Sequence, residues 1–337
     1  MLFDIIIVNM CFYKKGNKNM KICILDGGST NPGDISWAPI EKYGETTVYY
    51  NTPAELVIER AKDADVIVMN RINLSREVVN QLPNLKLVAA LATGYNSIDL
   101  EVTKERNIPV CNVPVYCIET VAQHAFALLM ALCNHVEHHS EMIKNGKWDE
   151  SIVHSSTVVP FFELYGKTLG IVGYGNIGKT VANMAKALGM KIIVYTRTKR
   201  ESENGVEFVS LDELMRRSDV ISLHCALNDQ TRGLISREKI AMMKNTALII
   251  NTARGAVVDE EALAEALNEN KVAGYGTDVM THEPPLESDA LLKAKNTVFT
   301  SHIAWASRDA RMRLVEVVAS NIGAFIDGSP RNVVNGL

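Results

Sequence analysis

Short apolar runs alternate with amphipathic stretches along most of this chain. The first series of runs that fit buried strands covers residues 21–26, 46–51, 65–70, 86–91 and 108–113. Polar or amphipathic stretches such as residues 53–63 lie between these runs and fit helices. This alternation is typical of a parallel sheet whose strands are joined by crossover helices.

A long helical pattern at residues 119–146 separates this series from a second one. The second series covers residues 168–173, 191–196, 219–225, 246–251, 272–278 and 296–301, and a last helical pattern follows at 307–328. The pattern predicts an α/β protein with two doubly wound parallel-sheet domains, Rossmann-like or flavodoxin-like. The last helix could return to either domain.

Residues 1–19 precede a second methionine, Met20, which opens the first strand pattern. Asp4 stands where a signal peptide needs positive charge, and no small-residue cleavage site follows. We therefore expect a disordered or non-native extension rather than a targeting signal. An additional strand remains the alternative.

Composition limits the classes of function. A chain of 337 residues suits two domains, and 47% hydrophobic residues allow sizeable cores. The net charge of −4 indicates neither a nucleic-acid nor an acidic-membrane partner. No apolar run reaches the roughly 20 residues that span a membrane. The six cysteines form no C-x-x-C pair, which argues against a zinc site or disulfide framework and fits the cytoplasm.

A glycine-rich loop follows the strand pattern at residues 168–173 and opens a helix. Its residues are Gly173, Tyr174, Gly175, Asn176, Ile177 and Gly178. In this G-x-G-x-x-G motif the first glycine allows a tight turn, the second admits a pyrophosphate and the third lets helix and strand pack closely. The helix N-terminus then offers free N–H groups to phosphates. The loop predicts a dinucleotide site.

The next strand ends in Thr196 and Arg197, 18 residues beyond Gly178 (196 − 178). An acid at this place accepts the ribose hydroxyls of NAD, whereas a hydroxyl and a guanidinium suit a 2′-phosphate. Lys199 and Arg200 add positive charge. We expect a preference for NADP(H), with NAD(H) possible. The alternative is a solvated basic turn beside NAD that is bound through other contacts.

Three later strand patterns end in an arginine, a glutamate and a histidine: Arg254, Glu283 and His302. Each of these residues alone could have a purely structural role: Arg254 in a salt bridge, Glu283 as a surface acid and His302 as a buried histidine. Together, at the carboxyl edge of one sheet, they suit hydride transfer to a 2-oxo acid. Arg254 would bind the substrate carboxylate, and His302, oriented by Glu283, would donate the proton.

Several motifs show a resemblance to a known family. They are "VGYGNIG", "SLHCALNDQTRGLI", "MKNTALIINTARGAVVDEEAL", "GTDVMTHEPP" and "HIAWAS". From Met20 onward the chain resembles the D-isomer-specific 2-hydroxyacid dehydrogenases. The resemblance implies that Arg254 binds substrate and that Glu283 and His302 form the proton relay. It assigns the nicotinamide carboxamide to Asp278 and the substrate carboxylate to a loop with Thr93, Gly94 and Tyr95. Thr252 and Ala253 join the expected cofactor contacts.

The resemblance also implies a domain arrangement. A discontinuous substrate domain would contain residues 20–118 plus 303–337, and the cofactor domain would contain residues 119–302. The active cleft would lie between the two domains, and its closure would exclude water. A homodimer is expected, with the helix 119–140 near its interface. The sequence departs from the family pattern at Thr196, at Gln123 in place of glutamate, and at Ser301 in place of proline. We expect Gln123 to be harmless and Ser301 to loosen the backbone before His302.

Within the family, "HIAWAS" and "LDGGSTNPGDISW" resemble the glycerate dehydrogenase or hydroxypyruvate reductase branch. Trp305 beside His302 fits a small polar substrate. D-lactate or 2-hydroxyisocaproate dehydrogenase is the enzymatic alternative, and an NAD-sensing corepressor-like binding protein is the alternative of another class. His135, His138 and His139 have a spacing that can suit a metal, but no cysteine or clustered carboxylate completes a site, so we expect no metal.

Overall fold

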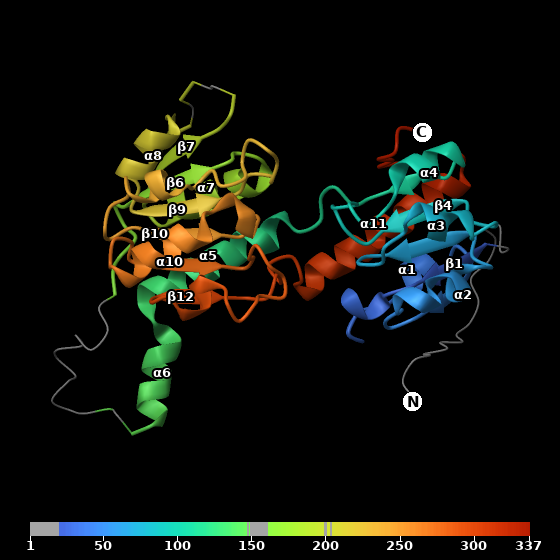
Figure 1. Cartoon of the computed structure of the whole chain (residues 1–337), viewed down its shortest axis with the longest axis horizontal. Coiled ribbons are helices and arrows are strands. Elements are labelled where there is room, and N and C mark those ends of the chain that lie inside the picture. The colour runs from blue at the N-terminus through green and yellow to red at the C-terminus, as the bar shows by residue number, and fades with distance from the viewer. Residues whose placement is uncertain (1–19, 147, 149–160, 199–200, 203) are drawn as a thin grey trace. The chain divides into compact units, whose positions relative to one another are not determined.

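The computed structural model describes residues 20–146, 148, 161–198, 201–202 and 204–337. The expected extension 1–19 and the basic residues Lys199 and Arg200 lie outside this part of the chain. The chain divides into two compact units (Figure 1). Unit 1 contains the residues up to Cys117 together with Ala306–Leu337, and unit 2 contains Ile118–Trp305.

Unit 1 is built on a five-stranded parallel sheet with the order β2-β1-β3-β4-β5. Its strands are β1 (Lys21–Ile24), β2 (Glu45–Val48), β3 (Val66–Met69), β4 (Leu87–Ala90) and β5 (Val110–Cys111). Its helices are α1 (Ala38–Glu41), α2 (Val57–Ala61), α3 (Arg76–Asn80), α4 (Leu100–Glu105) and α11 (Arg308–Ile326). Every residue of β3 and β4 is buried, as expected for strands covered on both faces.

The end of the chain completes the edge of this sheet. Cys111 in β5 forms an antiparallel bridge with Val333. The backbone N–H of Val334 donates to the carbonyl of Val110 (2.9 Å), and the N–H of Val110 donates to Oδ1 of Asn335 (3.2 Å). Helix α11 packs against α1 and β4, so the C-terminal helix returns to unit 1.

Unit 2 is built on a seven-stranded parallel sheet with the order β12-β11-β10-β9-β6-β7-β8. Its strands are β6 (Thr168–Val172), β7 (Lys191–Tyr195), β8 (Val206–Phe208), β9 (Val220–Leu223), β10 (Leu248–Asn251), β11 (Gly274–Thr277) and β12 (Thr297–Phe299). Its helices are α5 (Ile118–Asn134), α6 (Val136–Lys144), α7 (Asn176–Ala187), α8 (Leu211–Arg217), α9 (Arg237–Ile240) and α10 (Glu260–Asn268). The strand order reverses between β6 and β9, where doubly wound sheets bind ligands. Both sheets are parallel and doubly wound, which confirms the predicted fold class.

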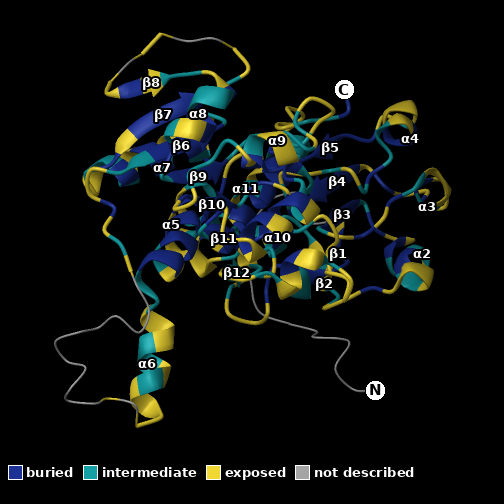
Figure 2. Cartoon of the chain, turned by 60° about the vertical axis from the view of Figure 1, so that its left-hand side comes forward, coloured by how far each residue is buried: buried dark blue, intermediate teal, exposed yellow. Residues whose placement is uncertain are grey.

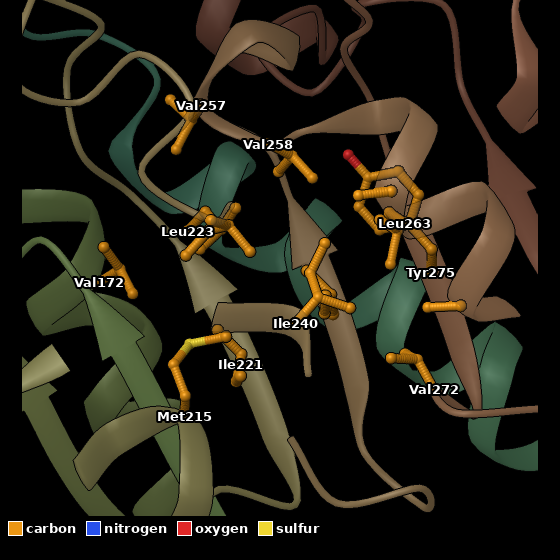
Figure 3. Close-up of a cluster of buried hydrophobic side chains, with 14 of the residues drawn as sticks. Val172, Met215, Ile221, Leu223, Ile240, Val257, Val258, Leu263, Val272 and Tyr275 are labelled. Carbon is orange, nitrogen blue, oxygen red and sulfur yellow. The ribbon is translucent and has the colours of Figure 1, made fainter. Parts of the chain in front are cut away.

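One buried cluster of unit 2 reaches the carboxyl ends of β6 and β9. Val172, Leu223 and Tyr275, from β6, β9 and β11, belong to one buried cluster with residues of α8 and α10 (Figure 3). These strands therefore end at fixed places, and the loops that follow them begin from a rigid platform. Strands β9, β10 and β11 are fully buried, whereas α6 is largely exposed (Figure 2). No helix in the described ranges has both the length and the apolar character to cross a membrane.

Two sequence predictions differ from the structure of unit 2. The helical pattern at residues 119–146 predicts an uninterrupted helix, which is wrong at His135. This residue has a left-handed φ of 49° and separates α5 from α6. Strand β8 was not predicted, because its single fully buried residue, Val206, leaves no apolar run to recognise.

Candidate active site

The glycine loop joins β6 to α7, and its glycines have different surroundings. Gly173 has a φ of 95°, and a Cβ there would lie 2.7 Å from the carbonyl oxygen of His224. A Cβ at Gly178 would lie 2.2 Å from the carbonyl oxygen of Gly173. A Cβ at Gly175 would meet no atom within 4 Å, so the space over its backbone is open. Two glycines are thus required by the protein itself, and the third leaves room for a ligand.

Helix α7 begins at Asn176 without a side-chain cap, so its first N–H groups face the same open space as Gly175. Such a helix N-terminus favours phosphate. Ile177 packs against the core beneath, and the ring of Tyr174 lies edge-on to Phe208 with centroids 5.5 Å apart. Tyr174 and Ile177 therefore anchor the loop, while Gly175 and Asn176 border the open space over it.

A pocket of about 390 Å³ continues from the glycine loop along the ends of β7 and β9. Thr196 and Arg197 both line it. The Thr196 hydroxyl donates to the carbonyl of Thr198 (2.6 Å), and Arg197 Nη1 donates to Gln230 Oε1 (3.3 Å). The guanidinium keeps further donors for an anion, whereas the Thr196 hydroxyl would have to turn. Sequence reasoning did not single out Gln230, which stands within the motif "SLHCALNDQTRGLI" and lies 33 residues along the chain from Arg197.

Two residues after β9 contact this region and have altered pKa values. Burial lowers the pKa of His224 to about 4, so its imidazole is neutral near pH 7 and shares a hydrogen bond of 2.8 Å with Ser222 Oγ. Burial also raises the pKa of the Cys225 thiol, which lines the pocket. The Cys225 thiol therefore adds no charge to the pocket near pH 7.

Arg254 follows β10 in a turn fixed by a buried amide. The side chain of Asn251 is fully buried, accepts from the N–H of Ala253 (3.0 Å) and donates to the carbonyl of Arg254 (3.1 Å). Arg254 itself is exposed, and its Nη1 donates to the carbonyl of Ala253 (2.6 Å). Asn251 was not predicted, although a polar residue at the end of an apolar strand could have indicated it.

Thr252 and Gly255 flank Arg254 and define its surroundings. The buried Thr252 hydroxyl has no hydrogen-bond partner among the described residues, so a bound ligand would satisfy it. A Cβ at Gly255 would lie 2.0 Å from the backbone carbon of Met280. The turns after β10 and β11 therefore touch, which brings the backbone of Arg254 close to the segment that carries Glu283.

Glu283 and His302 are in direct contact. His302 Nδ1 lies 2.6 Å from Glu283 Oε2, and the other carboxylate oxygen accepts from the N–H of Met280 (3.2 Å). Since a carboxylate only accepts, the proton of the neutral imidazole lies on Nδ1 and leaves Nε2 available. The two side chains are 35% and 38% exposed, so a small molecule can reach them. The indole of Trp305 donates to the carbonyl of His302 (2.9 Å).

Asp278, the expected carboxamide ligand, is almost fully buried, at 1% exposure. Its carboxylate accepts hydrogen bonds from the backbone N–H groups of Ile303 (2.9 Å) and Ala304 (2.8 Å). It also accepts from Thr300, a residue that sequence reasoning did not single out. Its observed contacts are thus with the segment that carries His302.

The expected substrate loop follows β4 in unit 1. Thr93 donates through its hydroxyl to the carbonyl of Val113 (2.7 Å), and its own carbonyl accepts from Asn112 Nδ2 (2.8 Å). Tyr95 packs against the core of unit 1, and a Cβ at Gly94 would meet no atom within 4 Å. The loop is therefore anchored at both ends and open at Gly94. Within the described ranges, no three His, Cys, Asp or Glu side chains are arranged to hold a metal ion.

The chain is similar to known proteins over most of its length. Residues 126–304 match the family model described as D-isomer specific 2-hydroxyacid dehydrogenase, NAD binding domain. A hydroxypyruvate reductase of Blautia hydrogenotrophica is 44% identical over 322 residues, 94% of this chain and 100% of that protein. A glyoxylate reductase of Korarchaeum cryptofilum is 42% identical over 286 residues, 83% of this chain and 86% of that protein. The solved structure of an acyclic imino acid reductase in complex with NADPH and D-Arg matches with a TM-score of 0.79 at 32% identity, over 94% of this chain and 100% of that chain.

Proposed function

The chain belongs to the D-isomer-specific 2-hydroxyacid dehydrogenase family, and from this membership we propose that it reduces hydroxypyruvate to D-glycerate, and glyoxylate to glycolate, reversibly. Its activity is that of an NAD(P)-dependent oxidoreductase acting on CH–OH donors. The contact of 2.6 Å between His302 and Glu283 carries the proposal, because a carboxylate at Nδ1 stabilises the imidazolium form, and that form carries the proton on Nε2 that the reduction needs. The names of the two relatives support the choice of substrates.

Each residue of the proposed site has one task. Arg254 holds the substrate carboxylate through its guanidinium. His302 Nε2 donates the proton to the carbonyl oxygen that becomes the hydroxyl. Glu283 accepts from Nδ1 and stabilises the imidazolium form. Hydride for C2 comes from the bound nicotinamide cofactor, so that one hydride and one proton are added across the C=O bond.

The cofactor site accepts a dinucleotide on three observations: the open space over Gly175, the uncapped start of α7 and the unpartnered Thr252 hydroxyl. We assign the pyrophosphate to the glycine loop and the nicotinamide side to Thr252, Ala253 and Asp278. NADP(H) is the preferred form in this proposal, with NAD(H) possible. Arg197 supports it, because its guanidinium lines the pocket where an acid would repel a 2′-phosphate.

The proposal extends to domain roles and assembly. Residues 119–302 serve the cofactor, and residues 20–118 with 303–337 serve the substrate, with Thr93, Gly94 and Tyr95 offering backbone contacts to its carboxylate. The protein works as a cytoplasmic homodimer. Val136, Ile143 and Trp148 support the homodimer, because these large apolar side chains on and after α6 are 69%, 47% and 64% exposed. A monomeric mass in sedimentation equilibrium would remove the dimer from the proposal.

Kinetics on one preparation tests the function. We expect turnover of hydroxypyruvate and glyoxylate, with a higher kcat/KM for NADPH than for NADH. Arg254→Ala and His302→Ala should each lower kcat/KM by at least ~10²-fold, the scale of lost acid–base catalysis. Near-normal turnover in either variant contradicts the assignment of roles. Preference for pyruvate or 2-oxoisocaproate would favour an alkyl-binding enzyme, because a hydroxymethyl group needs hydrogen-bonding partners. Dinucleotide binding without turnover of any 2-oxo acid would favour a binding protein.

A further inference from the structure

A series of hydrogen-bonded polar side chains, anchored on the buried Asp278, contacts the segment that carries His302. Oδ1 of Asp278 accepts from Thr300 Oγ1 (2.6 Å) and from the N–H of Ile303 (2.9 Å), while Oδ2 accepts from the N–H of Ala304 (2.8 Å). One carboxylate thus holds the residue two positions before His302 and the two residues after it. Both carboxylate oxygens accept hydrogen bonds, so a rotation of the carboxylate would break at least one of them.

The backbone of His302 needs such a restraint. Its φ of 56° lies in the left-handed region, which a residue other than glycine adopts only when its surroundings hold it there. The N–H of His302 donates to the carbonyl of Asp278 (2.8 Å), and its carbonyl accepts from the indole of Trp305 (2.9 Å). The conformation that directs the imidazole toward Glu283 is therefore maintained from outside the residue.

The series of hydrogen-bonded side chains continues to a histidine that is distant in the sequence. His124 lies on α5, and its Nε2 is 2.8 Å from Thr300 Oγ1 and 3.6 Å from Asp278 Oδ1. The Thr300 hydroxyl has one proton and gives it to the carboxylate, so it must accept from His124. The imidazole proton of His124 therefore lies on Nε2. The direction of donation runs from His124 to Thr300 to Asp278.

We propose that His124 and Thr300 are positioning residues, which fix the Asp278 carboxylate and through it the backbone that presents His302. This inference rests on the proposed function for its catalytic consequence but not for its structural part. The His124 side chain is 20% exposed and the Asp278 side chain 1%, so water competes little with the chain. Hydrogen bonds to a buried charge strengthen one another in such surroundings. Removal of one of these side chains therefore loosens the whole turn that carries His302, and not only the hydrogen bond that is lost.

Matched variants test the proposal by two independent readouts. Thr300→Val keeps the shape and removes the hydroxyl, whereas Thr300→Ser keeps the hydroxyl. His124→Leu removes the donor and His124→Gln retains an N–H group. We expect amide hydrogen exchange at residues 302–304 to accelerate about tenfold in Thr300→Val and His124→Leu, and to stay near the parent rate in Thr300→Ser. Unchanged exchange in Thr300→Val overturns the proposal.

The kinetic readout separates positioning from a merely structural role. In Thr300→Val we expect kcat to fall about tenfold while the Kd for NADPH changes less than threefold, and Thr300→Ser to restore kcat. The double variant with His124→Leu should lose little more than either single variant, because the residues act as one chain. Equal losses in Thr300→Val and Thr300→Ser, or a dominant rise in Kd, overturn the positioning role. A parent protein without 2-oxo acid turnover refutes the proposed function, while accelerated exchange in Thr300→Val alone still supports the chain.

Discussion

Two glycines of the same loop should respond in opposite ways to the same added methyl group. In Gly178→Ala the new Cβ would lie 2.2 Å from the carbonyl oxygen of Gly173, so backbone must move. Helix propensity alone favours alanine over glycine by about 1 kcal/mol. Overpacking costs about 1–3 kcal/mol, with the upper end expected when no flexible side chain can yield. We therefore expect the free energy of unfolding to fall by about 2 kcal/mol.

Gly175→Ala is the matched control with the opposite expectation. The position has φ −77° and ψ −163°, which alanine adopts, and its Cβ would meet no protein atom within 4 Å. Alanine is a poorer N-cap than glycine but also restricts the unfolded chain, and these effects of up to about 1 kcal/mol oppose each other. Stability should therefore stay near the parent value. The methyl group fills the space proposed for the pyrophosphate, so the Kd for NADPH should rise at least about tenfold.

Urea unfolding followed by tryptophan fluorescence measures the first effect, and titration of NADPH fluorescence measures the second. The reasoning fails if Gly178→Ala is as stable as the parent, since the contact with Gly173 would then be relieved without cost. The assignment of the pyrophosphate to the space over Gly175 is refuted if Gly175→Ala binds NADPH with an unchanged Kd. If Gly175→Ala lowers the free energy of unfolding as much as Gly178→Ala does, the added methyl group meets protein atoms and the space over Gly175 is not empty.

The other predictions concern the pocket, pH and the Arg254 turn. Arg197→Ala should lower kcat/KM for NADPH about 10- to 100-fold and for NADH less than threefold, because a charge-assisted contact is worth roughly 1.5–3 kcal/mol. Equal losses of kcat/KM with the two cofactors would mean that Arg197 supports the structure and does not recognise the 2′-phosphate. Since the pKa of His224 falls to about 4 on folding, the unfolded chain binds more protons between pH 6.5 and 4. Stability should thus decrease as pH falls through this window, by up to about 3 kcal/mol, and urea unfolding of His224→Asn should show a smaller decrease. Gly255→Ala would press on Met280 and shift the turn of Glu283, so kcat should fall at least about tenfold; an unchanged kcat argues against this coupling.

Much of the fold could be predicted because buried parallel strands are continuous apolar runs. Each predicted run overlaps an observed strand, although β5 has only two residues, Val110 and Cys111. Strand β8 was not predicted, because the exposed Glu207 in its centre interrupts the apolar pattern. The break at His135 escaped for a different reason. Neither glycine nor proline marks it, so the left-handed residue has no local signal.

The candidate site was predictable where a motif combines residues that are close in sequence, and not where it depends on distant pairs. The contact between Glu283 and His302 followed from strand ends at one edge of a sheet. The bond between Arg197 and Gln230, and the donation from His124 to Thr300, join elements that only the folded chain brings together. Sequence periodicity carries no information about such pairs. The direction of the Thr196 hydroxyl likewise depends on its own turn rather than on the residue type.

The way in which residues 332–335 close the sheet of unit 1 has a consequence for synthesis on the ribosome. The unpaired backbone of β5 receives its partners from Val333, Val334 and Asn335, more than 220 positions later in the chain. Unit 2 is continuous and can complete its contacts as soon as Trp305 has emerged. The nascent chain therefore carries a finished unit 2 while the edge strand of unit 1 is still exposed to pairing with other chains. For the time needed to translate α11 and the segment after it, protection of that edge depends on chaperones and on the speed of the ribosome.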